Sequence, residues 1–231
     1  GIARNYNNIQ NSIPKKYPIF FSKPMNSIVL HGNPIRIEKD IDFNYELELG
    51  VMIGKKCSNI SKKDYLDYIG GYFLTLDLTE KTTIPLVAKN QGTWTVSKGY
   101  DFSTPVGEFI DKEAIPDPNN VILELIQNGK RVQLGCPKDL IYNISEQISI
   151  LSQTVTLNPG DLILSGTYDN IGGIKIGDSL EGNLYLNRGK SEIGRVDLNS
   201  KIKLDKPDFT IKFDVEILQK DILKSEMNGK F

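Results

Sequence analysis

Hydrophobic and polar residues alternate along much of the chain, and a period of two is the pattern of a β-strand with one buried face. From Ile41 to Val51 the odd positions are apolar, whereas the even positions 42 to 48 carry Asp, Asn, Glu and Glu. Further apolar stretches, separated by Gly, Pro and Asn, occupy 72–79, 162–167, 177–187, 191–199 and 209–218. The pattern therefore predicts a mostly β or α+β fold without the regular strand–helix alternation of a doubly wound parallel sheet.

Turn and capping residues predict one hairpin and one well-defined helix. Residues 121–134 read as a β-hairpin, because Asn128-Gly129 in their middle is a preferred pair for a type I′ turn. Asn143 precedes Glu146 by three residues, which is the spacing of a capping box for a helix over 143–153.

A second helix is predicted over about 62–69. Ser61 is a good N-cap residue, and Gly70-Gly71 marks the expected end of the helix. Both helices are short, so we expect them at the periphery of the sheets.

Length and charge narrow the class of protein. The 231 residues suit a single domain, with a core of about 1–215 and a C-terminal tail of about 216–231. Lys and Arg (28) nearly balance Asp and Glu (29), so we expect no nucleic-acid partner. No apolar run approaches the ~20 residues of a membrane span, and we expect no membrane partner.

The two cysteines bear on the compartment. Cys57 and Cys136 lack the spacing of a zinc site or a disulfide framework, which favours an intracellular protein. The first residue is Gly rather than Met, so we expect either a cytoplasmic chain or a mitochondrial one whose targeting segment is missing here.

Three carboxylates are the first candidates for chemistry. Glu46 and Glu48 share one face of the predicted strand, about 6.5–7 Å apart along it, and like charges so close repel unless water or a cation separates them. Asp77 lies between Leu76 and Leu78, where a lone carboxylate is costly to bury unless it is paired or binds a metal. Together they form an oxygen-only half-shell of the kind that Mg²⁺ or Mn²⁺ prefers. From the residues alone, a metal site and a solvent-exposed strand both remain open.

Two further stretches carry groups that suit an anion. Lys98 follows the segment TWTVS, although a lysine taken alone is most often a solvated surface group. Gly166-Thr167 ends an apolar strand and begins a Gly-rich loop, which is either an ordinary turn or a place where N–H groups and a hydroxyl approach an anion. No GxGxxG, P-loop or GxSxG motif is present.

Several sequence blocks, taken together and in order, resemble the fumarylacetoacetate hydrolase family. The closest likeness is to its small single-domain branch of acylpyruvate hydrolases and oxaloacetate decarboxylases. The blocks are ARNY (3–6), FSKP (21–24), ELELGVMIGKKC (46–57), YIGGYFLTLDLT (68–79), WTVSK (94–98), NPGDLILSGT (158–167) and SGTYDNIG (165–172). Their order and near-matching spacing are more specific than any single motif.

The resemblance implies a fold, a cofactor and a ligand. It implies a mixed β-roll around the site, with short peripheral helices, and a homodimer. It implies that Mg²⁺ or Mn²⁺ is held by Glu46, Glu48 and Asp77, and that Lys98 is catalytic. A small 2-oxo acid is then expected to contact Arg4, Lys81, Lys98, Gly166 and Thr167.

The chain departs from the family pattern around the substrate. A lid His–Glu dyad that activates water in the family is replaced here by Ile9 and Ser12, and neither side chain can move a proton in that way. A family Arg and Gln that face the substrate correspond to Lys81 and Ile84; lysine keeps the charge but loses the bidentate fork. His31, the single histidine, lies beyond the lid, and a turn or surface position is expected for it.

These observations predict a metal-dependent C–C bond hydrolase or lyase of this family, which acts on a small 2-oxo acid by acylpyruvate hydrolysis or oxaloacetate decarboxylation through a metal-stabilised enolate, with an oxaloacetate keto–enol tautomerase as an alternative. We expect acylpyruvate hydrolysis to be weak or absent, because losing a positioned acid–base pair costs about 10²–10⁴-fold. Oxaloacetate decarboxylation or keto–enol tautomerisation needs mainly the enolate stabilisation. A pseudoenzyme that binds metal and anion without turnover is the other alternative.

Overall fold

The computed structural model describes residues 1–6, 17–90, 92–187 and 204–218. The strands in these residues are β1 (Ile2–Ala3), β2 (Ile19–Phe20), β3 (Ile28–Leu30), β4 (Ile35–Ile37), β5 (Phe43–Tyr45), β6 (Leu47–Ile53), β7 (Ile69–Leu76), β8 (Thr79–Glu80), β9 (Thr104–Val106), β10 (Ile110–Asp111), β11 (Val121–Gln127), β12 (Lys130–Gly135), β13 (Leu162–Leu164), β14 (Gly172–Ile174), β15 (Ser179–Leu186) and β16 (Phe209–Ile217). The helices are α1 (Ile84–Lys89), α2 (Thr95–Lys98) and α3 (Ile144–Thr154), with short 3₁₀ helices η1 (Met25–Ser27), η2 (Tyr65–Tyr68), η3 (Lys112–Ala114) and η4 (Pro137–Asp139). The fold is mostly β with short helices, as predicted.

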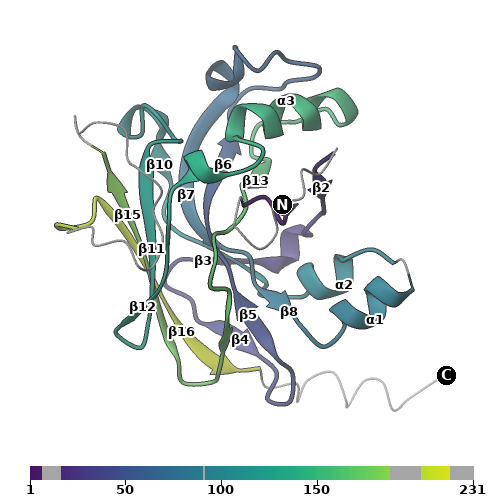
Figure 1. Ribbon diagram of the computed structural model, residues 1–231, viewed down its shortest axis with the longest axis vertical. Helices are drawn as coiled ribbons and strands as arrows, with labels where there is room; N and C mark the ends of the chain where they lie inside the picture. The colour runs from purple at the N-terminus through teal and green to yellow at the C-terminus, as the bar shows by residue number, and fades with distance from the viewer. Residues whose placement is uncertain (7–16, 91, 188–203, 219–231) are drawn as a thin grey trace.

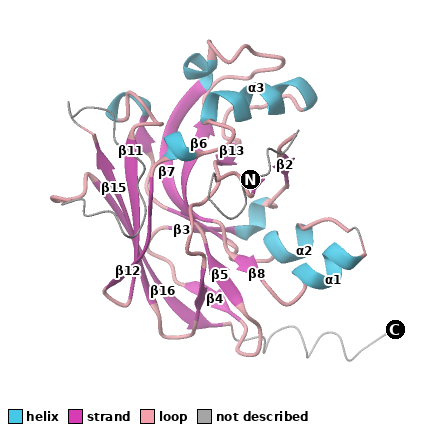
Figure 2. Ribbon diagram, in the orientation of Figure 1, coloured by secondary structure: helices cyan, strands magenta, loops and turns pink. Residues whose placement is uncertain are grey.

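Two larger sheets form the body of the fold. One has the strand order β13-β6-β7-β9-β3, with β10 beside β7, and the other has the order β12-β11-β15-β16-β4. Pairing is antiparallel except between β3 and β9 and between β16 and β4, so the sheets are mixed. The sheets curl around a common core, and α1, α2 and α3 lie on the outside (Figure 1; Figure 2).

The core includes the apolar odd positions of the predicted strand over 41–51, although β6 is buried on both faces rather than on one. Leu47 and Leu49 of β6 and Leu74 of β7 are fully buried, as are Leu123 and Leu125 of β11, and all belong to one cluster. Burial of each such side chain contributes about 1.5–3 kcal/mol. The apolar face therefore fixes the register of β6 and with it the positions of the glutamates that flank Leu47.

The predicted hairpin and the predicted capped helix are both confirmed. β11 and β12 pair antiparallel, and Asn128 and Gly129 between them have φ of 52° and 77°, as a type I′ turn requires. The Asn143 side chain accepts a hydrogen bond from the N–H of Glu146, whose carboxylate accepts one from the N–H of Asn143. This reciprocal pair starts α3 at Ile144.

The helix predicted over 62–69 is wrong, since only the 3₁₀ turn η2 forms there. The Ser61 hydroxyl accepts from the N–H of Lys63, which closes a tight turn instead of capping a helix. Gly70 does not end a helix either, because it lies within β7. A Cβ on Gly70 would come within 2.9 Å of the Cα of Gly54, so glycine is required for the close approach of two backbones.

Two strands that the sequence predicted as continuous are each interrupted beside a carboxylate. The strand over 41–51 divides into β5 and β6 at Glu46, and the strand over 72–79 divides into β7 and β8 around Asp77. β5 and β8 pair with each other in a separate three-stranded sheet with β14. Each carboxylate therefore stands at a junction between sheets rather than on a flat sheet face.

Some predictions concern residues beyond the described ranges. Ile9 and Ser12 of the predicted lid, the strand predicted over 191–199 and the end of the tail after 218 fall there. Among the helices that the structure describes, none combines the length and the apolar character needed to span a membrane.

Candidate metal centre

The junctions between β5 and β6 and between β7 and β8 bring the three predicted carboxylates together. One carboxylate oxygen from each of Glu46, Glu48 and Asp77 lies within 4.8 Å of the other two. The N–H of Asp77 donates to the carbonyl of Glu46 at 2.9 Å, which ties the two junctions to each other. Glu48 and Asp77 are each 1% exposed, so the predicted solvent-exposed alternative is excluded for them.

Two lysines bind this carboxylate cluster. Lys98, at the end of α2, donates from Nζ to Asp77 Oδ2 at 2.6 Å and to Glu46 Oε1 at 2.9 Å. Lys23 donates from Nζ to Asp77 Oδ1 at 2.7 Å. Both ammonium groups are almost completely buried, so these are charge-assisted bonds in a low-dielectric environment.

The two lysines differ in how many N–H donors remain for a ligand. Lys23 Nζ also donates to the carbonyl oxygens of Leu78 and Lys98, so its three donors are engaged within the protein. Lys98 Nζ has two carboxylate acceptors among the described residues, and the ring centroid of Phe21 lies 5.1 Å from it. Among the described residues, Lys98 therefore has one N–H donor more than its two carboxylate acceptors use.

Electrostatic coupling within the cluster shifts the carboxyl pKa values in opposite directions. Burial raises the pKa of Glu48 well above its usual range, and the carboxylates of Asp77 and Glu46 add to this shift. Burial also raises the pKa of Glu46, although Lys98 opposes the rise. Burial alone would raise the pKa of Asp77, but Lys98 and Lys23 together lower it. The two lysines thus compensate the negative charge of Asp77, whereas the negative charge of Glu48 is only partly compensated.

The lysine pKa values follow from the same contacts. Burial opposes the charge of Lys98, yet Asp77 and Glu46 raise its pKa above the usual lysine range. For Lys23, burial outweighs the attraction of Asp77 and lowers the pKa. A single carboxylate partner is therefore not enough to offset the desolvation of Lys23.

The loop after β13 touches the cluster through Gly166. The N–H of Gly166 donates to Glu48 Oε2 at 2.6 Å, and φ of 106° at this residue requires glycine. The Thr167 hydroxyl donates to the carbonyl of Leu47, between the two glutamates, at 2.9 Å. The structure thus brings the predicted residues Gly166 and Thr167 to the strand that bears the carboxylates.

The other predicted contacts lie farther out. Arg4 is exposed, with φ of 52°, and Lys81 is exposed just after β8. The neighbour of Arg4, Asn5, is buried and donates to the carbonyl of Ser165, which places Arg4 beside the Gly166 loop. His31 occupies a turn, with Nδ1 3.8 Å from Glu108 Oε1.

The sequence interpretation missed three residues that complete the centre. Lys23 lies in the FSKP block, but nothing in its spacing linked it to Asp77. Thr79 donates to Glu46 Oε1 at 2.6 Å, and its place two residues after Asp77 was the available clue. Gln133 is fully buried in β12 and accepts from the N–H of Leu47 at 2.9 Å. Gln133 lies between Val132 and Leu134 in the predicted hairpin, and this position was the available signal.

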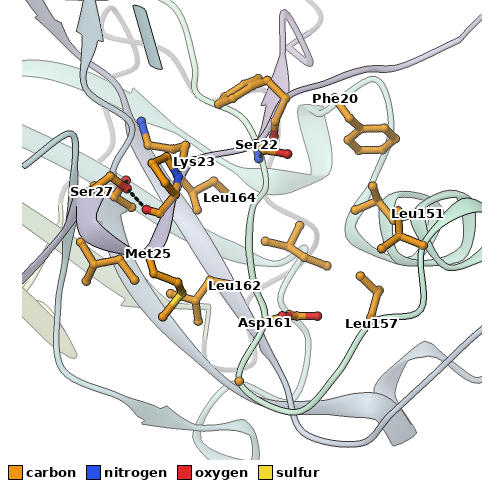
Figure 3. Close-up of a pocket in the computed structure, with 18 residues that line it drawn as sticks. Phe20, Ser22, Lys23, Met25, Ser27, Leu151, Leu157, Asp161, Leu162 and Leu164 are labelled. Atoms are coloured by element: carbon orange, nitrogen blue, oxygen red, sulfur yellow. Dashed lines mark hydrogen bonds between the residues drawn. The ribbon is translucent and has the colours of Figure 1, made fainter. Parts of the chain in front are cut away.

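A cavity of about 280 Å³ lies beside the centre but is not formed by it. Figure 3 shows Leu162 and Leu164 of β13 facing Leu151 and Leu157 across this space. Lys23 lines the cavity, while its ammonium group is bonded to Asp77. The three carboxylates are not among the lining residues, so the cavity is mainly an apolar neighbour of the centre.

The carboxylate cluster fits a hard divalent cation. It offers oxygen ligands alone, and carboxylate oxygens are the donors that such cations prefer. The raised pKa of Glu48 shows that its negative charge is poorly compensated by the protein itself. A divalent cation would supply that compensation, so the residues present suit a metal ion.

Comparison with known proteins agrees with this geometry. Residues 1–197 match the family model described as "Fumarylacetoacetate (FAA) hydrolase C-terminal". The chain is 39% identical over 186 residues to the mitochondrial oxaloacetate decarboxylase of Dictyostelium discoideum, covering 78% of this chain and 85% of the relative. It is 41% identical over 193 residues to the mitochondrial oxaloacetate tautomerase of Schizosaccharomyces pombe, covering 79% of this chain and 86% of the relative.

The fold is likewise that of solved family members. A yeast fumarylacetoacetate hydrolase family protein superimposes with a TM-score of 0.78 at 25% identity, covering 94% of this chain and 91% of the other. The sequence blocks, the curled mixed sheets and the buried acidic cluster thus agree with one another. The chain belongs to the fumarylacetoacetate hydrolase family of enzymes.

Proposed function

We propose that this enzyme uses Mg²⁺ or Mn²⁺ to act on a small 2-oxo acid, with oxaloacetate as the substrate and keto–enol tautomerisation or decarboxylation as the reaction. Glu46, Glu48 and Asp77 would hold the cation. The observation that carries the proposal is the convergence of these three carboxylates around the buried ammonium of Lys98. When bound, the cation supplies Lewis-acid polarisation of the 2-oxo and carboxylate oxygens.

Charge balance supports a small anionic ligand. Three carboxylates and the ammonium groups of Lys23 and Lys98 leave one negative charge in excess at full ionisation. A divalent cation converts this to one positive charge in excess, which the carboxylate next to the 2-oxo group neutralises, while the distal carboxylate of oxaloacetate lies outside the cluster. Unbalanced charge in a buried site is costly, so the balance favours an anionic ligand over a neutral one.

In this proposal Lys98 acts on the reacting oxygens. Its third N–H is the donor for a ligand that reaches the cluster. Fixed donors in a buried site stabilise developing negative charge without reorganisation. Lys23 instead holds Asp77 in place, because its donors are already engaged. Lys98 is therefore the catalytic residue of the proposal and Lys23 a positioning residue.

The ligand contacts of the proposal lie on two sides of the cluster. Thr167 and Gly166 border it through the loop after β13, where the N–H of Gly166 is already bonded to Glu48. The role we assign to Gly166 is therefore to let a ligand come close to the backbone, because its N–H donor is already engaged. Arg4 and Lys81 are exposed, and we assign to them the attraction of the distal carboxylate of a dicarboxylic substrate.

Two arguments favour tautomerisation and decarboxylation over acylpyruvate hydrolysis. Both need stabilisation of negative charge on the 2-oxo oxygen, whereas hydrolysis also needs an activated water. The positions of the family's water-activating dyad carry Ile9 and Ser12. The relatives named above are an oxaloacetate tautomerase and an oxaloacetate decarboxylase.

The proposed setting is a homodimer in mitochondria. Both relatives named above are mitochondrial proteins, and the family resemblance implies dimers. Light scattering on the purified chain tests the dimer, and fractionation of the source cells tests the compartment.

The deciding experiment compares wild type with Glu46→Ala on oxaloacetate in the presence of Mn²⁺. Loss of the enol absorbance reports tautomerisation and pyruvate release reports decarboxylation, after subtraction of the rate with free metal alone. We expect wild type to exceed Glu46→Ala in at least one assay and to show little turnover of acetylpyruvate. Equal rates for the two proteins in both assays would leave a metal- and anion-binding protein without turnover.

A further inference from the structure

The buried side-chain amide of Gln133 bonds both to β6 and to the loop after β13. The side chain is fully buried in β12, and its Oε1 accepts from the N–H of Leu47, the residue between Glu46 and Glu48. Its Nε2 lies 3.1 Å from Thr167 Oγ1, 3.2 Å from the carbonyl of Asp169 and 3.4 Å from the carbonyl of Tyr168. One side chain thus holds the carboxylate-bearing strand with its oxygen and the ligand loop with its nitrogen.

The same contacts determine the direction in which the Thr167 hydroxyl donates its hydrogen bond. A carbonyl oxygen only accepts, so the hydroxyl proton of Thr167 must lie toward Leu47. An amide nitrogen only donates, so Gln133 occupies one lone pair of the Thr167 oxygen. Rotation of the hydroxyl would break both bonds, and the Thr167 side chain is therefore held in a single orientation.

We propose that Gln133 is a positioning residue for the bound 2-oxo acid, acting through the orientation of Thr167. The proposal rests on the proposed function, in which Thr167 contacts that ligand. Gln133 itself does not touch the reacting atoms. Its loss leaves the Thr167 hydroxyl held by the carbonyl of Leu47 alone and so free to rotate about that bond, whereas the carboxylates keep their lysine and threonine partners.

Gln147 provides a matched control. It is also a fully buried glutamine, and its Nε2 donates to two carbonyl oxygens, those of Tyr142 and Ser165, each at 2.9 Å. Removal of its amide deletes the same chemical group from an equally buried place in α3. Gln147 does not, however, bond to the Thr167 hydroxyl.

A double-mutant cycle tests the proposal. Oxalate, which mimics the chelating part of a 2-oxo acid, is titrated calorimetrically into Mn²⁺-saturated protein. The proteins are wild type, Gln133→Met, Thr167→Val and the double variant, with Gln147→Met and Gln147→Met/Thr167→Val as the control cycle. Mn²⁺ alone is titrated into each protein as well.

We expect Gln133→Met and Thr167→Val each to weaken oxalate about tenfold, because each breaks one hydrogen bond in the link from Gln133 through Thr167 to Leu47 that fixes the ligand loop, with Mn²⁺ affinity changed much less. The double variant should also be weakened about tenfold, because either change breaks the same link. Gln147→Met should combine additively with Thr167→Val. If Gln133→Met does not fold, Gln133→Asn, a neutral amide one methylene too short to bond both Leu47 and Thr167, replaces it with the same expected result.

Other outcomes overturn the proposal in recognisable ways. A loss of about a hundredfold in the Gln133→Met/Thr167→Val variant would show that the two residues act independently. Equal weakening of Mn²⁺ and oxalate by Gln133→Met would show a merely structural role. Oxalate binding with a non-additive cycle but no turnover of oxaloacetate would support the role of Gln133 and reject the proposed function. Absence of oxalate binding by Mn²⁺-saturated wild type would reject both.

Discussion

Two buried polar clusters in this protein differ in how far the negative charge of their carboxylates is compensated. On β11, Glu124 is 4% exposed and accepts from Arg131, from the Tyr185 hydroxyl at 2.6 Å and from Asn183 at 3.3 Å. One carboxylate therefore meets one guanidinium and two neutral donors. The metal centre instead gathers three carboxylates around two ammonium groups.

The difference separates a structural cluster from a ligand site. The charges around Glu124 balance without any further group, so the cluster needs nothing from outside the chain. The centre at Glu46, Glu48 and Asp77 has one negative charge in excess at full ionisation, and burial together with the neighbouring carboxylates raises the pKa of Glu48. Unpaired charge that the fold maintains in a buried place indicates a function, because stability alone would remove it.

Replacement of Asp77 should have the largest effect on this comparison. Asp77→Asn removes the carboxylate to which both lysines donate, so we expect kcat/KM for oxaloacetate to fall about 10³-fold. Calorimetric titration should show Mn²⁺ binding lost, and the two partly unpaired ammonium groups should destabilise the fold by about 3 kcal/mol. Near wild-type Mn²⁺ affinity in Asp77→Asn would remove this residue from the ligand set.

Replacement of each lysine tests whether the two ammonium groups have different roles in the centre. Lys98→Met should lower kcat about 10²-fold with Mn²⁺ still bound, because it removes the donor that faces the ligand. Lys23→Met should lower the melting temperature more than kcat, since its donors hold the chain segments around Asp77. Steady-state kinetics and thermal melts on the same preparations check both. The reverse pattern would exchange the roles of the two residues.

The carboxylates and the hairpin could be predicted from sequence because each depends on local pattern. Asp77 between two leucines was costly to bury unless it was paired or bound to a metal, and Asn128-Gly129 favoured a turn of the chain. The family blocks then placed Lys98 beside Asp77, where the structure has it.

The remaining parts depend on contacts that no local pattern encodes. The position of Gly70 within β7 follows from the approach of Gly54, sixteen residues earlier in the chain. Lys23 reaches Asp77 across 54 residues, and Gln133 reaches Leu47 across 86. The sequence therefore indicated which carboxylates need compensation, but not the groups, distant along the chain, that contact them or their strand.

Removal of charge from the balanced cluster should affect stability alone. Glu124→Gln keeps an acceptor for Tyr185 but leaves Arg131 without its carboxylate. Because Arg131 is partly exposed and can be solvated, we expect a loss of about 1 kcal/mol in the free energy of unfolding. Urea denaturation measures this change, and kinetics on oxaloacetate should remain at the wild-type level. A marked loss of activity would show that the two clusters are coupled.

The metal-free protein should also show a pH dependence of its stability. Between about pH 4.3 and the raised pKa of Glu48, the folded protein keeps a proton on this side chain that the unfolded chain has released. The free energy of unfolding should therefore fall as pH rises through this range, by at most about 1.4 kcal/mol per pH unit for one group. Glu46, whose pKa is also raised, contributes with the same sign, whereas the lowered pKa of Asp77 acts only at lower pH.

Glu48→Gln isolates this dependence. The amide oxygen can still accept from the N–H of Gly166, but the side chain has no proton to release. In EDTA, thermal melts between about pH 5 and about pH 8 should show a shallower decline for Glu48→Gln than for wild type, and Glu48→Gln should be the more stable protein at the upper end. Saturating Mn²⁺ should reverse the order, because the cation stabilises only the chain that supplies the full carboxylate set. Parallel pH curves for the two metal-free proteins would mean that Glu48 is ionised without a cation, and the contrast with Glu124 would then rest on the number of carboxylates alone.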